Sequence, residues 1–215
     1  MLENLPILVV ILPLLAAPVC ILLRNHRVVW AWSVIVAWSA FILSIRLAVV
    51  VLVNGDVSYA MGGWAAPWGI EYHVDAFNAF VLLIVSANAS IVLLYAPHSV
   101  VREIHPDKRY LVFALFLLCM AGLLGITITG DLFNVFVFLE ISALSTYALV
   151  SMGHTRRALT SAYRYLIMGT IGSTFILIGI GLVYMMTGTL NMADLLVRLD
   201  EVEGTRTVLA AFGFL

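Results

Sequence analysis

The sequence predicts an all-α integral membrane protein with six transmembrane helices and the start of a seventh. Two features of its composition point to this class. Of the 215 residues, 63% are hydrophobic and only 11% are charged, whereas a soluble domain is about one quarter charged. The mean hydropathy is +1.10. Six apolar runs are also long enough to cross a hydrocarbon core of about 30 Å. We expect a single transmembrane domain over residues 1–215.

The six runs follow one another along the chain with short polar breaks between them. They cover residues 5–23, 28–53, 76–95, 110–129, 132–152 and 158–186, and a seventh begins near 207 and reaches the last residue. No positively charged segment precedes the first run, so it does not resemble a cleaved signal peptide. Asp75 and Asp131 stand directly before the third and fifth runs, where a carboxylate caps a helix and favours its dipole.

One substantial loop, residues 54–75, separates the second run from the third. It contains Asn-Gly, Gly-Gly and Pro turn signals and a strand-like WGIEYHV stretch, a pattern that predicts a short hairpin. We expect the hairpin to lie on the membrane surface as a capping loop, with Trp64, Trp68 and Tyr72 at the level of the lipid headgroups.

Basic residues are distributed unequally between alternate loops, and this predicts the orientation. One set of loops and adjoining helix ends carries eight of them: Arg24, Arg27, Arg102, Lys108, Arg109, Arg156, Arg157 and Arg164. The other set has only Arg198 and Arg206, beside Asp194, Asp200, Glu201 and Glu203. Because cytoplasmic loops are enriched in Lys and Arg, we expect the first set to be cytoplasmic and the N-terminus to lie outside.

Glu140 is the candidate functional residue, because it is the one charge in the apolar run 132–152. It lies roughly 12 Å from the start of that helix at 1.5 Å per residue. An ionised carboxylate at such depth costs about 2.5–3.5 kcal/mol and usually handles protons or ions, or pairs with a buried cation. Tyr147 and Ser151 share its helical face and form a candidate proton entry. Ser142, Ser145 and Thr146 point elsewhere, toward neighbouring helices.

No cofactor or metal site is predicted. The sequence contains no CxxC, HExxH, P-loop or GxGxxG motif, and its five histidines stand in loops or at helix ends without i, i+4 pairs. We interpret Cys20 and Cys119 as small buried hydrophobic residues. Glycines in the sixth run predict close helix contacts; these are Gly169, Gly172, Gly179 and Gly181.

Two segments together carry a family resemblance: TGDLFNVFVFLEISALSTYALVSMG at 129–153 and GTLNMADLLVRL at 188–199. They resemble the proton-antiporter-like membrane subunits of Mrp-type Na+/H+ antiporters, membrane-bound hydrogenases and respiratory complex I, and the D-type subunits of the Mrp antiporters most of all. GGWAAPWGIEYHVDAFNAF at 62–80 is also similar to that family. The resemblance extends over the whole chain.

The resemblance implies an inverted-repeat fold and a role for Glu140 as the intramembrane glutamate that moves protons. In the family this residue interacts with a lysine of the seventh helix, and this chain stops before that position. We therefore expect it to be a portion of a longer subunit, or, as an alternative, a split subunit completed by a second polypeptide. It would work with other membrane subunits and without a cofactor.

Three functions remain open at this point. The first is a proton-translocating subunit of a monovalent cation/proton antiporter that exchanges protons and Na+. The second is a proton-pumping membrane subunit of a complex I-like oxidoreductase or membrane-bound hydrogenase, with no redox site of its own. The third is a scaffold in which Glu140 only pairs with a buried base.

Overall fold

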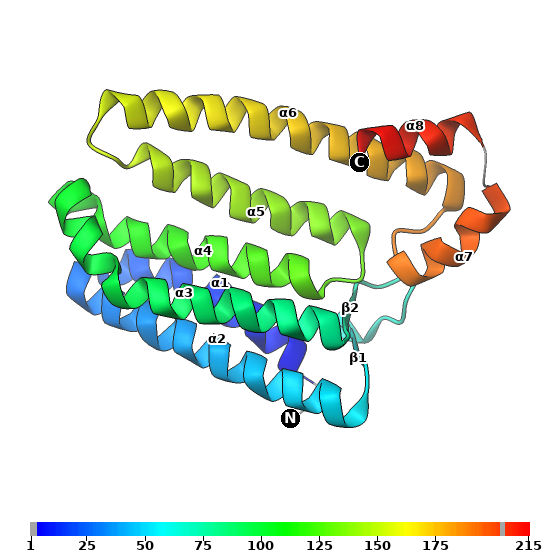
Figure 1. The fold of residues 1–215 in the computed structure, drawn as a ribbon, viewed down its shortest axis with the longest axis horizontal. Helices are drawn as coiled ribbons and strands as arrows, with labels where there is room; N and C mark the ends of the chain where they lie inside the picture. Colours follow the sequence, from blue (N-terminus) through cyan, green and yellow to red (C-terminus); the bar gives the residue numbers. More distant parts are fainter. Residues whose placement is uncertain (1–3, 203–204) are drawn as a thin grey trace.

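Six long helices lie side by side in the computed structural model, which describes residues 4–202 and 205–215 (Figure 1). All six are long and apolar enough to cross a membrane, so the prediction of an all-α fold with six transmembrane helices is confirmed. Glu203 and the side chain of Glu201, two of the predicted acidic loop residues, lie outside the described part. The helices are α1 (Leu5–Leu23), α2 (His26–Asn54), α3 (Ala76–Glu103), α4 (Arg109–Ile128), α5 (Leu132–Ser151) and α6 (Arg156–Thr187).

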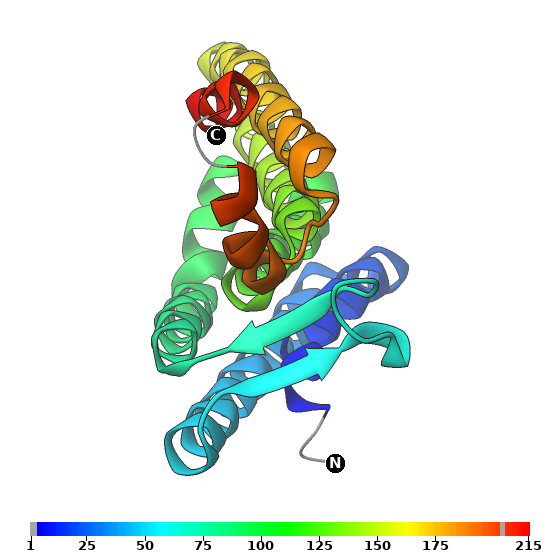
Figure 2. The ribbon, with the colours of Figure 1, turned by 90° about the vertical axis from the view of Figure 1, so that its right-hand side faces the viewer.

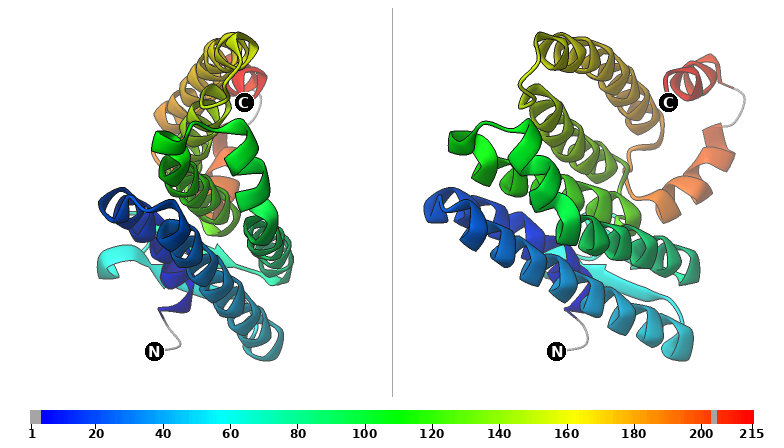
Figure 3. Two further views of the ribbon diagram at one scale, coloured as in Figure 1. Left: turned by 90° about the vertical axis from the view of Figure 1, so that its left-hand side faces the viewer. Right: turned by 60° about the vertical axis from the view of Figure 1, so that its left-hand side comes forward.

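The helices form a group of four with two more added in a row. α1 packs against α2 and α4, and α2 packs against α3; α5 then packs on α4, and α6 packs on α5 (Figure 3). The expected seventh segment is the helix α8 (Arg206–Phe214), which lies beside α6. As a result, α5 lies between α4 and α6, and both neighbours position its side chains.

A short helix that the sequence pattern did not predict, α7 (Met192–Val202), precedes α8. Its start has a local cause, since Asn191 Oδ1 accepts hydrogen bonds from the backbone N–H groups of Ala193 and Asp194, both at 3.0 Å. Within the helix the Arg198 guanidinium approaches the Asp194 carboxylate at 2.9 Å. The neighbouring Thr189 and the Arg198 guanidinium lower the pKa of the Asp194 carboxyl.

The third helix is eight residues longer than predicted, because it continues through Pro97 to Glu103. Proline removes one backbone hydrogen bond, but long transmembrane helices tolerate it where neighbouring groups compensate. The connection to α4 is then a short 3-10 helix, η2 (Pro106–Lys108).

The loop between α2 and α3 forms an antiparallel hairpin of β1 (Val57–Ala60) and β2 (Glu71–Val74), joined through the 3-10 turn η1 (Met61–Gly63). Val57 pairs with Val74, and Ala60 pairs with Glu71. The hairpin crosses the ends of the helices (Figure 2), where β2 contacts α1, α3 and α4.

Of the three hairpin aromatic residues that we expected at the lipid headgroups, Tyr72 lies elsewhere. Trp64 and Trp68 are exposed, but Tyr72 is only 2% exposed and packs against Phe138 of α5, with ring centroids 6.5 Å apart. Side chains alternate across a strand, and Tyr72 falls on the face of β2 that covers the helix ends. Its burial raises the pKa of the Tyr72 hydroxyl, and an interaction with Asn134 acts in the opposite direction.

The two ends of the bundle carry different elements. The turns α1–α2, α3–α4 and α5–α6, which hold most of the basic residues, lie together at one end (Figure 3, left). The hairpin, the α4–α5 turn and α7 lie at the other (Figures 1 and 2). The charge asymmetry in the sequence therefore corresponds to a charge difference between the ends of one bundle.

Candidate functional site

The helix that carries Glu140, α5, begins at a hydrogen-bonded cap. Asp131 Oδ1 accepts a hydrogen bond from the Asn134 backbone N–H at 2.8 Å, and Asn134 Nδ2 donates to Thr129 Oγ1 at 2.9 Å. Burial raises the pKa of the Asp131 carboxyl, while the backbone N–H groups of Asn134 and Phe133 act against the rise. The predicted capping role of Asp131 is confirmed, and Asp75 caps α3 in the same way, at 2.7 Å from the Asn78 N–H.

The segment before α5 is held on both sides by backbone hydrogen bonds. On one side the Gly130 N–H donates to the carbonyl of Glu71 in β2 at 2.8 Å. On the other side the Leu132 N–H donates to the Leu190 carbonyl, and the Met192 N–H donates to the Gly130 carbonyl, both at 2.9 Å. We call residues 71–72, 129–132 and 190–192 the hairpin junction. It joins the hairpin, the start of α5 and the start of α7.

Side chains reinforce the hairpin junction. Asn191 Nδ2 donates to Glu71 Oε2 at 2.9 Å, and the Ser58 hydroxyl donates to Glu71 Oε1. Ser58, Glu71 and Asn191 also line a cavity of about 350 Å³ that opens beside Gly130. Sequence reasoning missed the Glu71–Asn191 contact, because the two residues are 120 positions apart and neither stands in a local motif that points to the other.

Replacing Asn191 with Asp tests whether the Glu71 contact stabilises the junction. The variant Asn191→Asp keeps an oxygen to cap α7, but it loses the amide donor and places a second carboxylate beside Glu71. We expect it to lower the free energy of unfolding by about 1–3 kcal/mol. Thermal unfolding of the purified full-length protein measures this.

The double variant Asn191→Asp, Glu71→Gln provides the matching control, because it removes the repulsion and supplies an amide donor from the other side. We expect it to regain most of the lost stability. Equal destabilisation by the single and the double variant would show that the contact contributes nothing.

The contact between α4 and α5 fixes the height and rotation of Glu140. A Cβ atom added at Gly122 of α4 would lie 2.7 Å from the Phe138 carbonyl oxygen and 2.8 Å from Ser142 Cβ. At Gly125 a Cβ would overlap the Phe138 ring. Beside these glycines Cys119 Sγ lies 3.6 Å from Ser142 Oγ and 3.4 Å from Thr146 Oγ1. Ser142 and Thr146 therefore face α4, consistent with the prediction that they point away from Glu140.

Glu140 is half-buried on a side of α5 that neither neighbour covers completely. Its helical face includes Phe133, which is 45% exposed, and Leu144, which is 50% exposed. Within residues 4–202 and 205–215 its carboxylate has no hydrogen-bond or ion-pair partner. The structure thus presents a carboxyl group inside an apolar span and leaves one side of it open to a further partner.

Tyr147 and Ser151, the predicted proton entry, lie further along α5 toward the end with the basic turns. Tyr147 is buried: its ring contacts Tyr165 of α6 edge to face, with centroids 4.7 Å apart, and its hydroxyl fits over Gly169, where a Cβ would collide with it. Ser151 donates its hydroxyl hydrogen to the Ala148 carbonyl at 2.7 Å. Tyr147 therefore forms part of the α5–α6 contact, and Ser151 forms a hydrogen bond within its own helix.

The predicted glycine contacts of α6 are only partly present. Gly169 lies against Tyr147, and Gly179 lies against α8, where a Cβ would be 3.0 Å from the Ala211 carbonyl oxygen. Gly172 and Gly181, however, have no atom of the described residues within 4 Å of an added Cβ. Among the described residues the predicted contact is therefore missing at these two positions.

Comparison with known proteins places this arrangement in a family. Residues 129–215, which begin at the hairpin junction, match the family model described as NADH:quinone oxidoreductase/Mrp antiporter, transmembrane. Among curated relatives, the N-type subunit of the NADH-quinone oxidoreductase of Desulforudis audaxviator is 40% identical over all of this chain and 43% of the relative. The D-type subunit of the Na+/H+ antiporter of Alkalihalophilus pseudofirmus is 32% identical over 94% of this chain and 41% of the relative.

Solved structures give the same result. The chain superposes with a TM-score of 0.88 and 31% identity on a chain of an archaeal membrane-bound sulfane sulfur reductase, covering 98% of this chain and 43% of the other. On a chain of the Mrp complex of a Dietzia species it superposes with a TM-score of 0.85 and 25% identity, covering 99% of this chain and 39% of the other. A chain of respiratory complex I of Thermus thermophilus shares the fold, with a TM-score of 0.79 and 20% identity.

The chain therefore spans about two-fifths of the length of the relatives it matches. It is similar to them along its whole length, in sequence and in the arrangement of its helices. The chain is thus similar to antiporter-like membrane subunits over its whole length, and its residues 129–215 match the NADH:quinone oxidoreductase and Mrp antiporter family.

Proposed function

We propose that this chain is part of a proton-translocating membrane subunit in which Glu140 takes up and releases the proton. The observation that carries the proposal is the position of this carboxyl group: it is half-buried in an apolar span, and no described residue pairs with it. Such a group is stable in hydrocarbon when it is neutral, or when it is ionised beside a cation. A partner that approaches and leaves would therefore switch Glu140 between the two states.

Tyr147 and Ser151 are proposed to lie on the path by which protons reach Glu140. Both stand on α5 between Glu140 and the end that carries the basic turns. We propose that this end is cytoplasmic, that the N-terminus lies outside, and that the membrane is the cell (inner) membrane. Protons would then enter from the cytoplasm past the Tyr147 hydroxyl, which occupies the α5–α6 contact above Gly169.

Two assemblies are compatible with this chemistry. In the first, the subunit belongs to a monovalent cation/proton antiporter and exchanges protons for Na+; the similarity to the D-type subunit of an Na+/H+ antiporter and to a chain of the Mrp complex supports it. In the second, electron transfer in other subunits drives proton pumping; the 40% identity to a membrane protein of an NADH-quinone oxidoreductase and the similarity to the sulfane sulfur reductase support that assembly.

The deciding experiment is a transport measurement on the whole complex, purified with its native subunits and reconstituted into liposomes. An imposed pH gradient that Na+ dissipates without any electron donor identifies the antiporter. Proton uptake that requires an electron donor and acceptor identifies the redox-driven pump. No proton movement under either condition, by a complex shown to be intact, would contradict the proposed function. The neighbouring genes offer an independent check, since small Mrp-type subunits accompany the first and iron–sulfur proteins the second.

A further inference from the structure

The hydroxyl group of Tyr147 differs from three other hydroxyl groups of α5 in what accepts its proton. Ser145 and Thr146 each donate to the carbonyl one turn earlier, at 2.6 and 2.8 Å, and Ser151 donates to the carbonyl three residues earlier. Their protons are held by their own helix. Within residues 4–202 and 205–215 the Tyr147 hydroxyl has no hydrogen-bond partner, so its proton is available to another acceptor.

A gap in α6 receives this hydroxyl group. The Tyr147 ring contacts Tyr165 edge to face, with centroids 4.7 Å apart. Gly169 lies one turn further along α6, on the same helical face as Tyr165. A Cβ atom at Gly169 would be 2.6 Å from Tyr147 Cζ and would overlap the hydroxyl oxygen. We call the space left by the missing side chain of Gly169, beside Tyr165, the Gly169 notch.

The Gly169 notch lies at a depth similar to that of Glu140. At 1.5 Å per residue, Gly169 is about 20 Å from the start of α6, and Glu140 is about 17 Å from the end of α5. A short turn joins these two helix ends (Figure 1). The backbone of Tyr147 is only about 6 Å from the end of α5. Helical side chains lean toward the N-terminus of their helix, so Tyr147 leans toward Glu140 and the notch holds its hydroxyl there.

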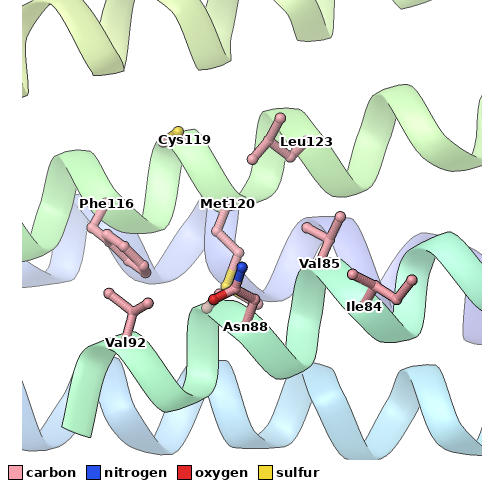
Figure 4. Close-up of a pocket in the computed structure, with 9 residues that line it drawn as sticks. Ile84, Val85, Asn88, Val92, Phe116, Cys119, Met120 and Leu123 are labelled. Carbon is pink, nitrogen blue, oxygen red and sulfur yellow. The ribbon is translucent and has the colours of Figure 1, made fainter. Parts of the chain in front are cut away.

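The cavity on the other side of α4 offers no comparable arrangement. It lies between α3 and α4, has a volume of about 260 Å³ and is lined mainly by apolar side chains (Figure 4). Asn88 and Cys119 are the polar residues among the described ones that line it. Cys119 lies on the side of α4 away from α3, and its sulfur is 3.4 Å from Thr146 Oγ1 of α5. The cavity therefore contains no chain of proton-carrying groups among the described residues.

We propose that Gly169 is a positioning residue for proton transfer, because the absence of a side chain there lets the Tyr147 hydroxyl stand in the α5–α6 contact at the depth of Glu140. The hydroxyl donates its proton toward Glu140 and takes another from the side of Ser151, so it ends neutral, as it began. The inference rests on the proposed function, in which protons pass Tyr147 on the way to Glu140. Both sides of the contact belong to this chain, on α5 and α6.

The substitution Gly169→Ala in the full-length subunit of the native complex tests the proposal. The added methyl group displaces the hydroxyl from the notch, and a displacement of about 1 Å can slow a reaction by up to roughly 100-fold. We expect proton transport per assembled complex, measured in liposomes, to fall roughly 10- to 100-fold. Gly172→Ala is the matched control on the same helix, since a Cβ there meets no described atom within 4 Å, and it is expected to keep the unsubstituted rate. Equal rates in the two variants would overturn the proposal.

A double-mutant cycle with Tyr147→Phe separates positioning from simple packing. Tyr147→Phe removes the oxygen, leaves α6 unchanged and is expected to slow transport at least as much as Gly169→Ala. Adding Gly169→Ala to Tyr147→Phe is then expected to change the rate by less than about twofold, because the hydroxyl that Gly169 positions is already absent. A second full loss in the double variant would show that Gly169 only spaces the helices, and an unchanged rate in Tyr147→Phe would show that the hydroxyl carries no proton. Either result would contradict the inference.

The ratio of the transport rates in H2O and D2O supplies a readout that a loss of folded complex does not move. It is expected to rise in Gly169→Ala, because the proton step becomes slower than the others, and an unchanged ratio would count against positioning. The variant Glu140→Gln distinguishes the two levels of failure. Inactive Glu140→Gln with a normal rate in Gly169→Ala rejects the role of the notch alone, whereas normal transport in Glu140→Gln rejects the proposed function itself.

Discussion

Replacing Glu140 with Gln in the full-length subunit is expected to abolish proton-coupled transport by the assembled complex, with a loss of roughly 100-fold or more. Gln has nearly the same shape and can occupy the same half-buried position on α5, but it cannot bind and release a proton. Transport is measured as the rate of ΔpH dissipation or formation in liposomes. The proportion of assembled complex, read on a native gel, is expected to stay unchanged.

The conservative variant Glu140→Asp separates titration from packing. It keeps a carboxyl group on the same face of α5 and is expected to retain part of the transport. Two results would contradict the proposal. Transport at the unsubstituted rate in Glu140→Gln would show that the carboxyl group carries no proton, and loss of assembly with normal transport per assembled complex would identify Glu140 as a structural partner of a buried base.

Introducing a methyl group at Gly122 is expected to destabilise the protein, because the α4–α5 contact leaves no room for it. The new Cβ would meet the Phe138 carbonyl and Ser142 at 2.7–2.8 Å. One of these contacts is backbone, so α4 and α5 have to separate, and overpacking of this kind costs about 1–3 kcal/mol. We expect Gly122→Ala to lower the thermal unfolding midpoint of the purified full-length protein.

Gly172→Ala is the control for the intrinsic effect of adding a methyl group to a helix of this bundle. Gly172 is on α6, and a Cβ there meets no atom of the described residues within 4 Å. Because Ala favours a helix more than Gly does, we expect the free energy of unfolding to rise by about 0.4–1 kcal/mol. A rise of the midpoint in Gly122→Ala equal to that in Gly172→Ala would show that the close approach of α4 and α5 does not limit stability.

Gly122→Ala also has a functional consequence, because α5 carries Glu140. The start of α5 is fixed by the hairpin junction and its middle by the glycines of α4. A shift of the middle alone would tilt Glu140 relative to any partner that approaches its open side. We therefore expect transport to fall in this variant even at temperatures where the protein remains folded, and the liposome assay used for Glu140 measures it.

The linear sequence predicted the elements that depend on local chemistry. Apolar length identified all six long helices, and Asp75 and Asp131 marked two of their starts because a capping carboxylate bonds to residues only three positions away. The Asn191 cap of α7 follows the same rule, and the Leu-Asn-Met-Ala-Asp stretch carries a signal from which it could have been predicted. Glu140 could also be singled out from its neighbours in the sequence, because it is the one charge in an apolar run.

The rest depended on the tertiary structure, for a reason specific to membrane proteins. In water a polar face and an apolar face distinguish the outside of a helix from its inside, but in a bilayer both faces are apolar and the sequence period is weak. Sequence alone therefore could not decide that Tyr72 is buried, or that Gly169 has a contact among the described residues and Gly172 has none there. Residue chemistry was therefore sufficient to predict the six long helices and the carboxyl group that Glu140 places among them. The open side of α5, and the meeting of Glu71 with Asn191 at its start across 120 positions of sequence, depended on how the helices pack.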